Sequence, residues 1–269
     1  MRCRLLRRID IKGMTFMIAT AVTDKGIKKN TNQDSVLIKI ASTDFGDVAF
    51  CAVCDGMGGL SSGELASATV INALNNWANN ILPGLLYSGF NQQTLDNQWN
   101  ELLLNINNKM IGYGASLGIN LGTTVVILLV VGGWYYCINV GDSRLYILNQ
   151  GITQVTVDQT VVQREIQLGN ISPEQAAVDA RRNVLLQCVG SSRVITPEFY
   201  TGQYSGATMF MMCTDGFRHK VSEEEMFESL NPYTAKNEPI MEKNSRELVE
   251  LNKNRMETDN ISVLLLRAE

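Results

Sequence analysis

The feature that most constrains this chain is an apolar run that ends in an aspartate followed by small, flexible residues. It appears first at residues 48–59 (VAFCAVCDGMGG) and recurs at 134–143 (WYYCINVGDS) and 208–216 (TMFMMCTDG). The order is reversed at 259–266 (DNISVLLL), where Asp-Asn precedes the run. Each run has the β-branched, aromatic and sulfur-bearing residues typical of a buried strand between turns. The sequence therefore predicts four buried strands, each with a carboxylate at one end.

These carboxylates predict a metal site. Asp-Gly and Asp-Asn are ordinary turn sequences, so any one of them alone indicates only a turn. A carboxylate at the end of a buried strand is unfavourable unless it is paired or binds a cation. Most of the four have no basic residue beside them, which favours convergence on metal ions. Oxygen ligands select Mg²⁺ or Mn²⁺, and a two-metal centre can activate water and clamp a phosphoryl group.

Composition and motifs disfavour several other classes of protein. The 269 residues are 45% hydrophobic and carry a net charge of −4, which fits one globular domain and argues against a nucleic-acid surface. The single histidine, His219, excludes a histidine-based zinc site and disfavours a Ser-His-Asp triad. It lies between Arg218 and Lys220, where we expect it to be solvated. No phosphate loop of the type G-x-x-x-x-G-K-[ST] is present.

The cysteines are expected to be buried, structural residues in a reducing cytoplasm. Cys51-x-x-Cys54 has the spacing of a redox or zinc half-motif. Residues three apart on a strand face opposite sides of the sheet, however, and no second pair completes a zinc site. The other cysteines interpreted in this way are Cys137, Cys188 and Cys213.

The apolar stretch 123–140 raises the alternative of a membrane-spanning helix. Gly132-Gly133 lies at its centre and valines are frequent on both sides, which favours two buried strands joined by a tight turn. No apolar run of signal-peptide length precedes Thr15. We therefore expect a cytoplasmic protein with no membrane segment.

Hydrophobic spacing places helices between groups of strands. Ser61-x-x-Glu64 and Ser222-x-x-Glu225 are capping boxes that open helices. The stretch 79–93 is expected to be a loop, and Ser205-Gly206 is expected to join a hairpin. The expected strands are 15–23, 35–41, 47–54, 123–131, 133–140, 145–148, 152–155, 195–204, 208–214 and 261–267. Strands in hairpin runs with helices between them predict an α+β fold of mainly antiparallel sheets with helices on their outer faces.

We expect a single domain over residues 14–269. The first residues are locally basic, with four arginines before Asp10. A physiological start at Met14 would leave 1–13 as a basic tail outside the domain, either disordered or artefactual.

Seven short motifs follow one another along the chain, and one of them alone would be weak. In this order, over essentially the whole of 15–267, they resemble the metal-dependent PP2C/PPM protein Ser/Thr phosphatases, especially the compact bacterial kind. The motifs are Lys29-x-x-Asn32-Gln33-Asp34-Ser35, Asp55-Gly56-Met57-Gly58-Gly59, Gly122-Thr123-Thr124, Val140-Gly141-Asp142-Ser143-Arg144, Arg181-Arg182-Asn183-Val184-Leu185, Thr214-Asp215-Gly216 and Asp259-Asn260-Ile261-Ser262-Val263.

The resemblance implies a four-layer α-β-β-α sandwich with a two-metal site at one end of its sheets. In it Asp55 bridges both ions, the Gly56 carbonyl binds one, and Asp215 and Asp259 hold the other. Asp34 orders metal-bound water. A bridging hydroxide attacks phosphorus directly, without a phosphoenzyme.

The resemblance also implies a third, weaker ion at Asp142 and a flap at 159–182 that shapes substrate choice. The chain departs from the family in four places. Lys29 replaces an Arg that meets the phosphate, and it keeps the charge but loses the bidentate fork. Gln33 replaces a common Glu, Met57 a frequent His, and Gln159 stands where an Asp-His pair usually continues.

The function expected from these residues is Mn²⁺- or Mg²⁺-dependent hydrolysis of phosphoserine and phosphothreonine in proteins. The alternative is a catalytically weak relative that binds phosphoproteins as a regulatory module, suggested by Lys29 and the altered flap. We expect a monomer with no nucleic-acid partner. A cognate Ser/Thr kinase is a family expectation that no residue here identifies.

Overall fold

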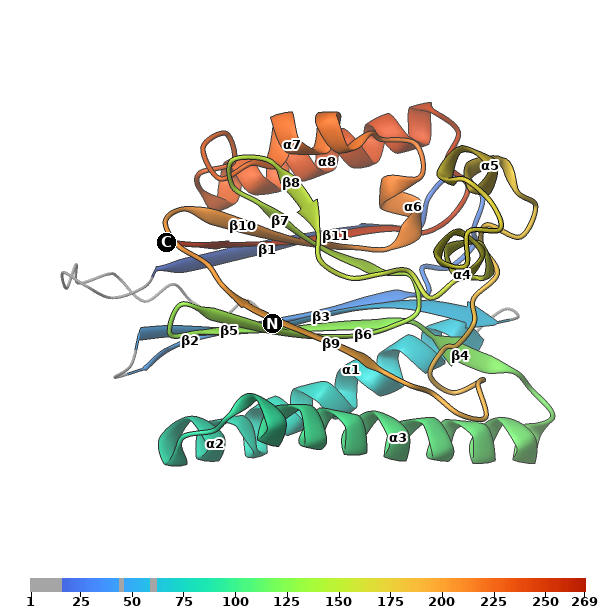
Figure 1. The fold of residues 1–269 in the computed structure, drawn as a ribbon, viewed down its shortest axis with the longest axis horizontal. Helices are drawn as coiled ribbons and strands as arrows, with labels where there is room; N and C mark the ends of the chain where they lie inside the picture. Colours follow the sequence, from blue (N-terminus) through green and yellow to red (C-terminus); the bar gives the residue numbers. More distant parts are fainter. Residues whose placement is uncertain (1–15, 44–45, 59–61) are drawn as a thin grey trace.

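The computed structural model has two β-sheets packed face to face, with helices on both outer faces (Figure 1). The structure describes residues 16–43, 46–58 and 62–269, and all of the following concerns these residues. The five-stranded sheet has the order β1 (Met17–Asp24), β11 (Ile261–Ala268), β10 (Thr208–Cys213), β7 (Arg144–Leu148), β8 (Ile152–Gln154). The six-stranded sheet has the order β2 (Asp34–Thr43), β3 (Gly46–Gly58), β5 (Val125–Val131), β6 (Trp134–Val140), β9 (Glu198–Gln203), with β4 (Leu121–Thr123) paired to β3.

The helices are segregated by layer. The six-stranded sheet is covered by α1 (Ser62–Asn80), α2 (Leu82–Ser88) and α3 (Gln92–Leu117), and the five-stranded sheet by α7 (Glu223–Leu230) and α8 (Glu238–Asn254) (Figure 1). Three short helices lie at one end of the sandwich: α4 (Val161–Gln167), α5 (Pro173–Val178) and α6 (Asp215–Arg218). All strand pairs are antiparallel. The predicted α-β-β-α sandwich is therefore confirmed.

Both faces of the central strands are buried, which explains why their sequences are continuously apolar. Along β3, Cys51 and Val53 pack between the two sheets, whereas Phe50 and Cys54 pack against the helices. On the helical side Phe50 lies 5.4 Å from Trp77, measured between ring centroids. The two cysteines of the Cys-x-x-Cys sequence thus face opposite layers, as predicted.

The stretch considered as a membrane helix forms the β5–β6 hairpin. Its turn contains Gly132 and Gly133 at φ of 58° and 79°, a left-handed pair that matches the twist of the strands. No helix within the described part of the chain is both long and apolar enough to cross a membrane.

Two local predictions are wrong. Residues 195–214 do not form a hairpin, because β9 pairs with β6 while β10 pairs with β7 and β11, so the chain crosses between sheets around Gly206. A turn sequence can reverse the direction of the chain, but it does not determine which strands the two flanking strands pair with. The expected loop at 79–93 contains α2, where Pro83 is tolerated in the first turn and Leu82 is buried.

Some predictions fall on residues outside the described parts. These are the basic tail 1–13, the start at Met14 and the capping box that begins at Ser61. The other predicted capping box is confirmed, since Glu225 N–H donates to Oγ of Ser222 and Ser222 N–H donates to the Glu225 carboxylate.

Candidate metal centre

Strand ends from both sheets meet at the end of the sandwich that carries α6. Asp34 opens β2 and pairs in register with Asp55 of β3. Asp215 opens α6 directly after β10, Asp259 precedes β11, and Asp142 lies between β6 and β7. A cavity of about 470 Å³ is lined by Lys29, Asp55, Gly56, Asp142, Asp215 and Asp259, among other residues. The fold therefore brings the predicted ligands to one cavity, with Asp34 beside it.

The backbone of Asp55 is held by the Gly-Thr-Thr motif. Its carbonyl oxygen accepts hydrogen bonds from Thr124 N–H and from Thr123 Oγ1, both at 2.9 Å. Its N–H donates to Thr124 Oγ1 at 3.0 Å. Thr124 Oγ1 also lies 2.7 Å from Ser143 Oγ, the residue after Asp142. Two motifs far apart in sequence thus fix the backbone of Asp55, whose side chain lines the cavity.

Gly56 is required by close packing against the start of α1. A Cβ at this position would lie 2.1 Å from the Gly63 carbonyl oxygen and 2.5 Å from that of Gln33. Gly56 N–H also donates to the Gln33 oxygen at 3.2 Å. No larger residue can stand beside Asp55 without moving these backbone segments.

Asn260 holds the loop that leads to Asp34. Its side-chain oxygen accepts from Gln33 N–H at 2.9 Å, and its Nδ2 donates to the carbonyl oxygens of Lys25 at 2.9 Å and Thr31 at 3.1 Å. An amide is needed here because one side chain must both donate and accept. The Asp-Asn pair therefore combines a candidate ligand with a clamp on the facing loop.

Within the described residues, no basic side chain forms an ion pair with Asp34 or Asp55. Burial raises the pKa of Asp34 to about 7, although hydrogen bonds from Ser262 and Thr214 favour its ionised form. Burial and the neighbouring carboxylates, with Asp34 first among them, raise the pKa of Asp55 well above its usual value. Buried carboxylates of one sign at a single site are unfavourable unless a cation joins them.

Within the described residues, three basic side chains contact the predicted ligands: Lys29, His219 and, at Asp142, Arg218. Lys29 Nζ lies 2.9 Å from Oδ1 of Asp259. His219 lies between Asp215, at 3.6 Å, and Glu257, at 3.4 Å. Its side chain is only 22% exposed, so the prediction of a solvated histidine is wrong. Asp215 lies only four residues before His219, but Glu257 comes from the segment before β11, and nothing next to His219 in the sequence indicates that partner.

The site fits a divalent cation, with adjustment of these contacts. Within the described residues, no three Asp, Glu, His or Cys side chains are arranged to hold an ion as they lie. In the same part of the chain, however, Oδ1 of Asp34 and Oδ1 of Asp215 are buried without a hydrogen-bond partner. Unsatisfied carboxylate oxygens are the donors that Mg²⁺ and Mn²⁺ prefer.

Asp142 has a different environment from the other candidates. Arg218, from the end of α6, contacts its carboxylate at 3.3 Å, and the same guanidinium lies 3.5 Å from Asp158. Asp158 in turn binds Arg144 at 2.7 Å. Burial and the nearby Asp215 raise the pKa of Asp142 to about 7, against the opposing effect of Arg218. Sequence inspection missed Arg218 and Asp158 because ion pairs between distant segments leave no local signal.

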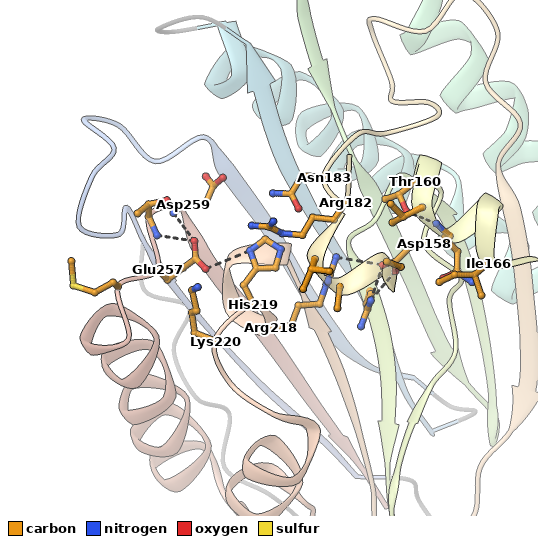
Figure 2. A pocket seen from close by; sticks show the side chains of 18 residues that line it. Asp158, Thr160, Ile166, Arg182, Asn183, Arg218, His219, Lys220, Glu257 and Asp259 are labelled. Carbon is orange, nitrogen blue, oxygen red and sulfur yellow. Dashed lines mark hydrogen bonds and ion pairs between the residues drawn. The ribbon is translucent and has the colours of Figure 1, made fainter. Parts of the chain in front are cut away.

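The segment that resembles the family's flap begins at Gln159, whose side chain is buried and accepts hydrogen bonds. Its Oε1 accepts from Gly141 N–H at 2.8 Å and from Gln187 Nε2 at 2.7 Å. A second cavity, of about 880 Å³, lies beside this segment and shares Asn183 and Asp259 with the first (Figure 2). The two cavities therefore adjoin at the candidate metal site.

Comparisons with known proteins agree with this geometry. The sequence model of the protein phosphatase 2C family matches residues 25–252. Serine/threonine protein phosphatase PstP of Mycobacterium tuberculosis is 27% identical over 249 residues, which cover 91% of this chain and 44% of the relative. Serine/threonine phosphatase stp of Listeria monocytogenes is 29% identical over 182 residues, covering 66% of this chain and 70% of the relative. The chain thus spans less than half the length of the mycobacterial relative.

Solved structures show the same fold. The Streptococcus agalactiae serine/threonine phosphatase superposes with a TM-score of 0.80 at 24% identity, covering 93% of this chain and 99% of the other. The catalytic domain of the phosphatase PstP, solved in complex with 2 manganese ions, has a TM-score of 0.75 at 26% identity and covers 95% and 99%. With the family match extending over residues 25–252, which include every residue lining the cavity except Asp259, the chain belongs to the protein phosphatase 2C family.

Proposed function

We propose that this chain is a Mn²⁺- or Mg²⁺-dependent protein phosphatase that hydrolyses phosphoserine and phosphothreonine. The observation that carries the proposal is the single cavity lined by Asp55, Asp215 and Asp259. Burial and neighbouring carboxylates raise the pKa of Asp55 and of the adjacent Asp34, which indicates that negative charge accumulates there. A site with excess negative charge binds phosphate only after cations have reversed its sign.

The residues of the site fall into two groups, those that would bind the metal ions and one that would orient the attacking water. Asp55, the Gly56 carbonyl, Asp215 and Asp259 would hold two ions. Bound divalent ions would supply an activated water and neutralise the phosphoryl oxygens. Asp34, with one carboxylate oxygen free of hydrogen bonds within the described residues, would accept a hydrogen bond from the attacking water and so orient it.

Lys29 is suited to the substrate phosphate. It is the only basic side chain among the described residues lining the smaller cavity, and 41% of it is exposed. Burial lowers the pKa of Lys29, but the hydrogen bond to Asp259 and nearby carboxylates outweigh this effect and raise it, so it stays charged. We propose that a cation replaces Lys29 at Asp259 and that the freed ammonium then binds a phosphate oxygen.

The larger cavity suits the peptide that flanks the phosphorylated residue. It adjoins the metal site, and Figure 2 shows Arg182, Lys220 and Thr160 among the side chains lining it. Phosphoproteins are the substrate class that such an open cavity beside the site accommodates.

The test is turnover of phosphopeptides that differ only in the phosphorylated residue. With Mn²⁺, phosphoserine and phosphothreonine peptides should release phosphate faster than the phosphotyrosine peptide, and excess EDTA should stop the reaction. Asp55→Asn should abolish turnover, whereas Asp96→Asn, on α3 away from the cavity, should not. Turnover that persists in EDTA would falsify the proposal, and phosphopeptide binding without turnover would identify a regulatory module.

A further inference from the structure

Among the described aspartates that line the smaller cavity, Asp142 is the one whose carboxylate forms an ion pair with an arginine, the buried Arg218. Asp215 and Arg218 lie three residues apart on α6, so their side chains share one face of the helix. Nη2 of Arg218 lies 3.3 Å from Oδ2 and 3.2 Å from the main-chain oxygen of Asp142, and 3.5 Å from Oδ2 of Asp158. The Arg218, Asp142 and Asp158 side chains are 13%, 9% and 11% exposed. One guanidinium nitrogen therefore contacts three oxygens from two segments.

The charges of this cluster balance without an added ion. Arg144 donates two hydrogen bonds of 2.7 Å to Asp158, one to each carboxylate oxygen, and a third to the hydroxyl of Tyr146 at 2.6 Å. The interactions of Asp158 are drawn in Figure 2. Two carboxylates and two guanidiniums alternate in space, and removing any one of them would leave a buried charge unpaired.

A third divalent ion at Asp142 does not fit this arrangement. Mg²⁺ and Mn²⁺ take about six oxygen ligands, and Oδ2 and the main-chain oxygen of Asp142 already accept from Arg218. Arginine cannot lose its proton to make room. A divalent ion and the guanidinium would repel one another if both lay against the same carboxylate.

We propose that the guanidinium of Arg218 takes the place of a third metal ion at Asp142, so that this chain binds two divalent ions and not three. The inference rests on the proposed metal-dependent function. Arg218 is then a positioning residue. Its ion pairs hold Asp142 next to α6, which also carries Asp215, and connect Asp142 to Asp158. Asp158 directly precedes the segment 159–182. The anchoring of that segment would not depend on metal concentration, as it would if an ion made the link.

The stoichiometry of Mn²⁺ binding tests the proposal without any measurement of activity. Titration calorimetry and elemental analysis of the wild-type chain at millimolar Mn²⁺ should give about two ions per chain. Asp142→Asn should leave that number unchanged. A wild-type chain that binds about three ions, one of which disappears in Asp142→Asn, would overturn the proposal.

Variants of the arginine sharpen the test. Arg218→Gln frees the Asp142 carboxylate, so it should gain a weaker third ion, and the double variant Asp142→Asn/Arg218→Gln should lose it again. The matched control is Arg144→Gln, which removes an arginine of the same cluster that does not contact Asp142 and should keep the wild-type number. A folded Arg218→Gln chain, checked by circular dichroism, that takes up no additional ion contradicts the proposal.

The outcome separates this inference from the proposed function. Two bound ions without phosphatase turnover would support the role of Arg218 and reject the catalytic proposal. Three bound ions with phosphatase turnover would support the catalytic proposal and reject the role of Arg218.

Discussion

Two groups of carboxylates lie at the same end of this sandwich, and they differ in whether a basic side chain contacts them. Asp34 and Asp55, paired in register across β2 and β3, make no contact with a basic side chain within the described residues, and burial raises the pKa of both. Asp142 and Asp158 are also little exposed, but each contacts an arginine: Arg218 lies against both carboxylates and Arg144 pairs with Asp158, even though burial still raises the pKa of Asp142 to about 7. Both groups consist of aspartates, so the presence or absence of a contacting arginine is what distinguishes the structural cluster from the proposed metal site.

The difference has opposite consequences for stability and activity. Where no internal cation exists, an external cation stabilises the fold by binding it, and the charge can be used in chemistry. Where arginine supplies the charge, the cluster stabilises the fold at any metal concentration. The following changes test whether the two groups behave in these opposite ways, beginning with the largest expected effect.

Replacing Asp55 should eliminate activity while increasing the stability of the metal-free chain. Asp55→Asn should lower kcat/KM by about 10³-fold or more, since loss of metal-assisted charge stabilisation is worth several kcal/mol. The same variant should unfold at a higher temperature in EDTA, because it removes an uncompensated buried charge. Kinetics with a phosphothreonine peptide and thermal unfolding in EDTA measure the two effects. An EDTA-treated variant less stable than wild type would contradict the contrast.

Replacing Arg218 should have the opposite effect on stability. Arg218→Gln leaves Asp142 and Asp158 with one fewer cation in a buried cluster, so it should lower the free energy of unfolding in EDTA by about 3 kcal/mol or more. Urea denaturation measures the loss. The double variant with Asp142→Asn should recover part of it, and equal stabilities of the single and double variants would show that the pair is not coupled.

Replacing Lys29 should affect substrate binding more than stability. The side chain is 41% exposed, so solvent weakens its ion pair with Asp259. Lys29→Met should raise KM for phosphopeptides roughly tenfold, the value of about 1–2 kcal/mol for a charge-assisted hydrogen bond at an accessible site. Lys29→Arg should keep KM at or below the wild-type value. An unchanged KM in Lys29→Met would remove the phosphate-binding role.

The smallest effect is expected at the ion pair between Glu225 in α7 and Arg255 at the end of α8. The guanidinium of Arg255 contacts Glu225 at 2.6 Å and 2.8 Å, and with the helix-cap hydrogen bond from Ser222 it lowers the pKa of Glu225 from 4.5 to about 2. A lowered folded-state pKa contributes stability above pH 4.5 that is lost as the pH falls toward 2. The stability difference between wild type and Glu225→Gln should therefore shrink between pH 5 and pH 3 in urea denaturation. A difference independent of pH would rule out this linkage.

Much of the fold and site could be predicted because it depends on local sequence. Apolar runs such as those ending at Asp55 and Asp215 are short, rich in β-branched, aromatic and sulfur-bearing residues and followed by turn residues, which favours strands, and Ser222-x-x-Glu225 caps its own helix. Gly132-Gly133 turns the chain with the hand that a hairpin needs. These features follow from steric preferences and hydrogen bonds among residues close in sequence, so the chain itself determined them.

Other features were decided only when distant segments packed together. Ser205-Gly206 makes a turn, but the partners of β9 and β10 depend on which sheet can bury each strand, and here they join different sheets. His219 lies beside two basic residues in sequence, yet the fold places it between Asp215 and Glu257. Arg218 meets Asp142 for the same reason. Sequence determined which residues carry charge, and the tertiary structure decided which charges are paired, because Coulomb interaction and burial depend on distance in space.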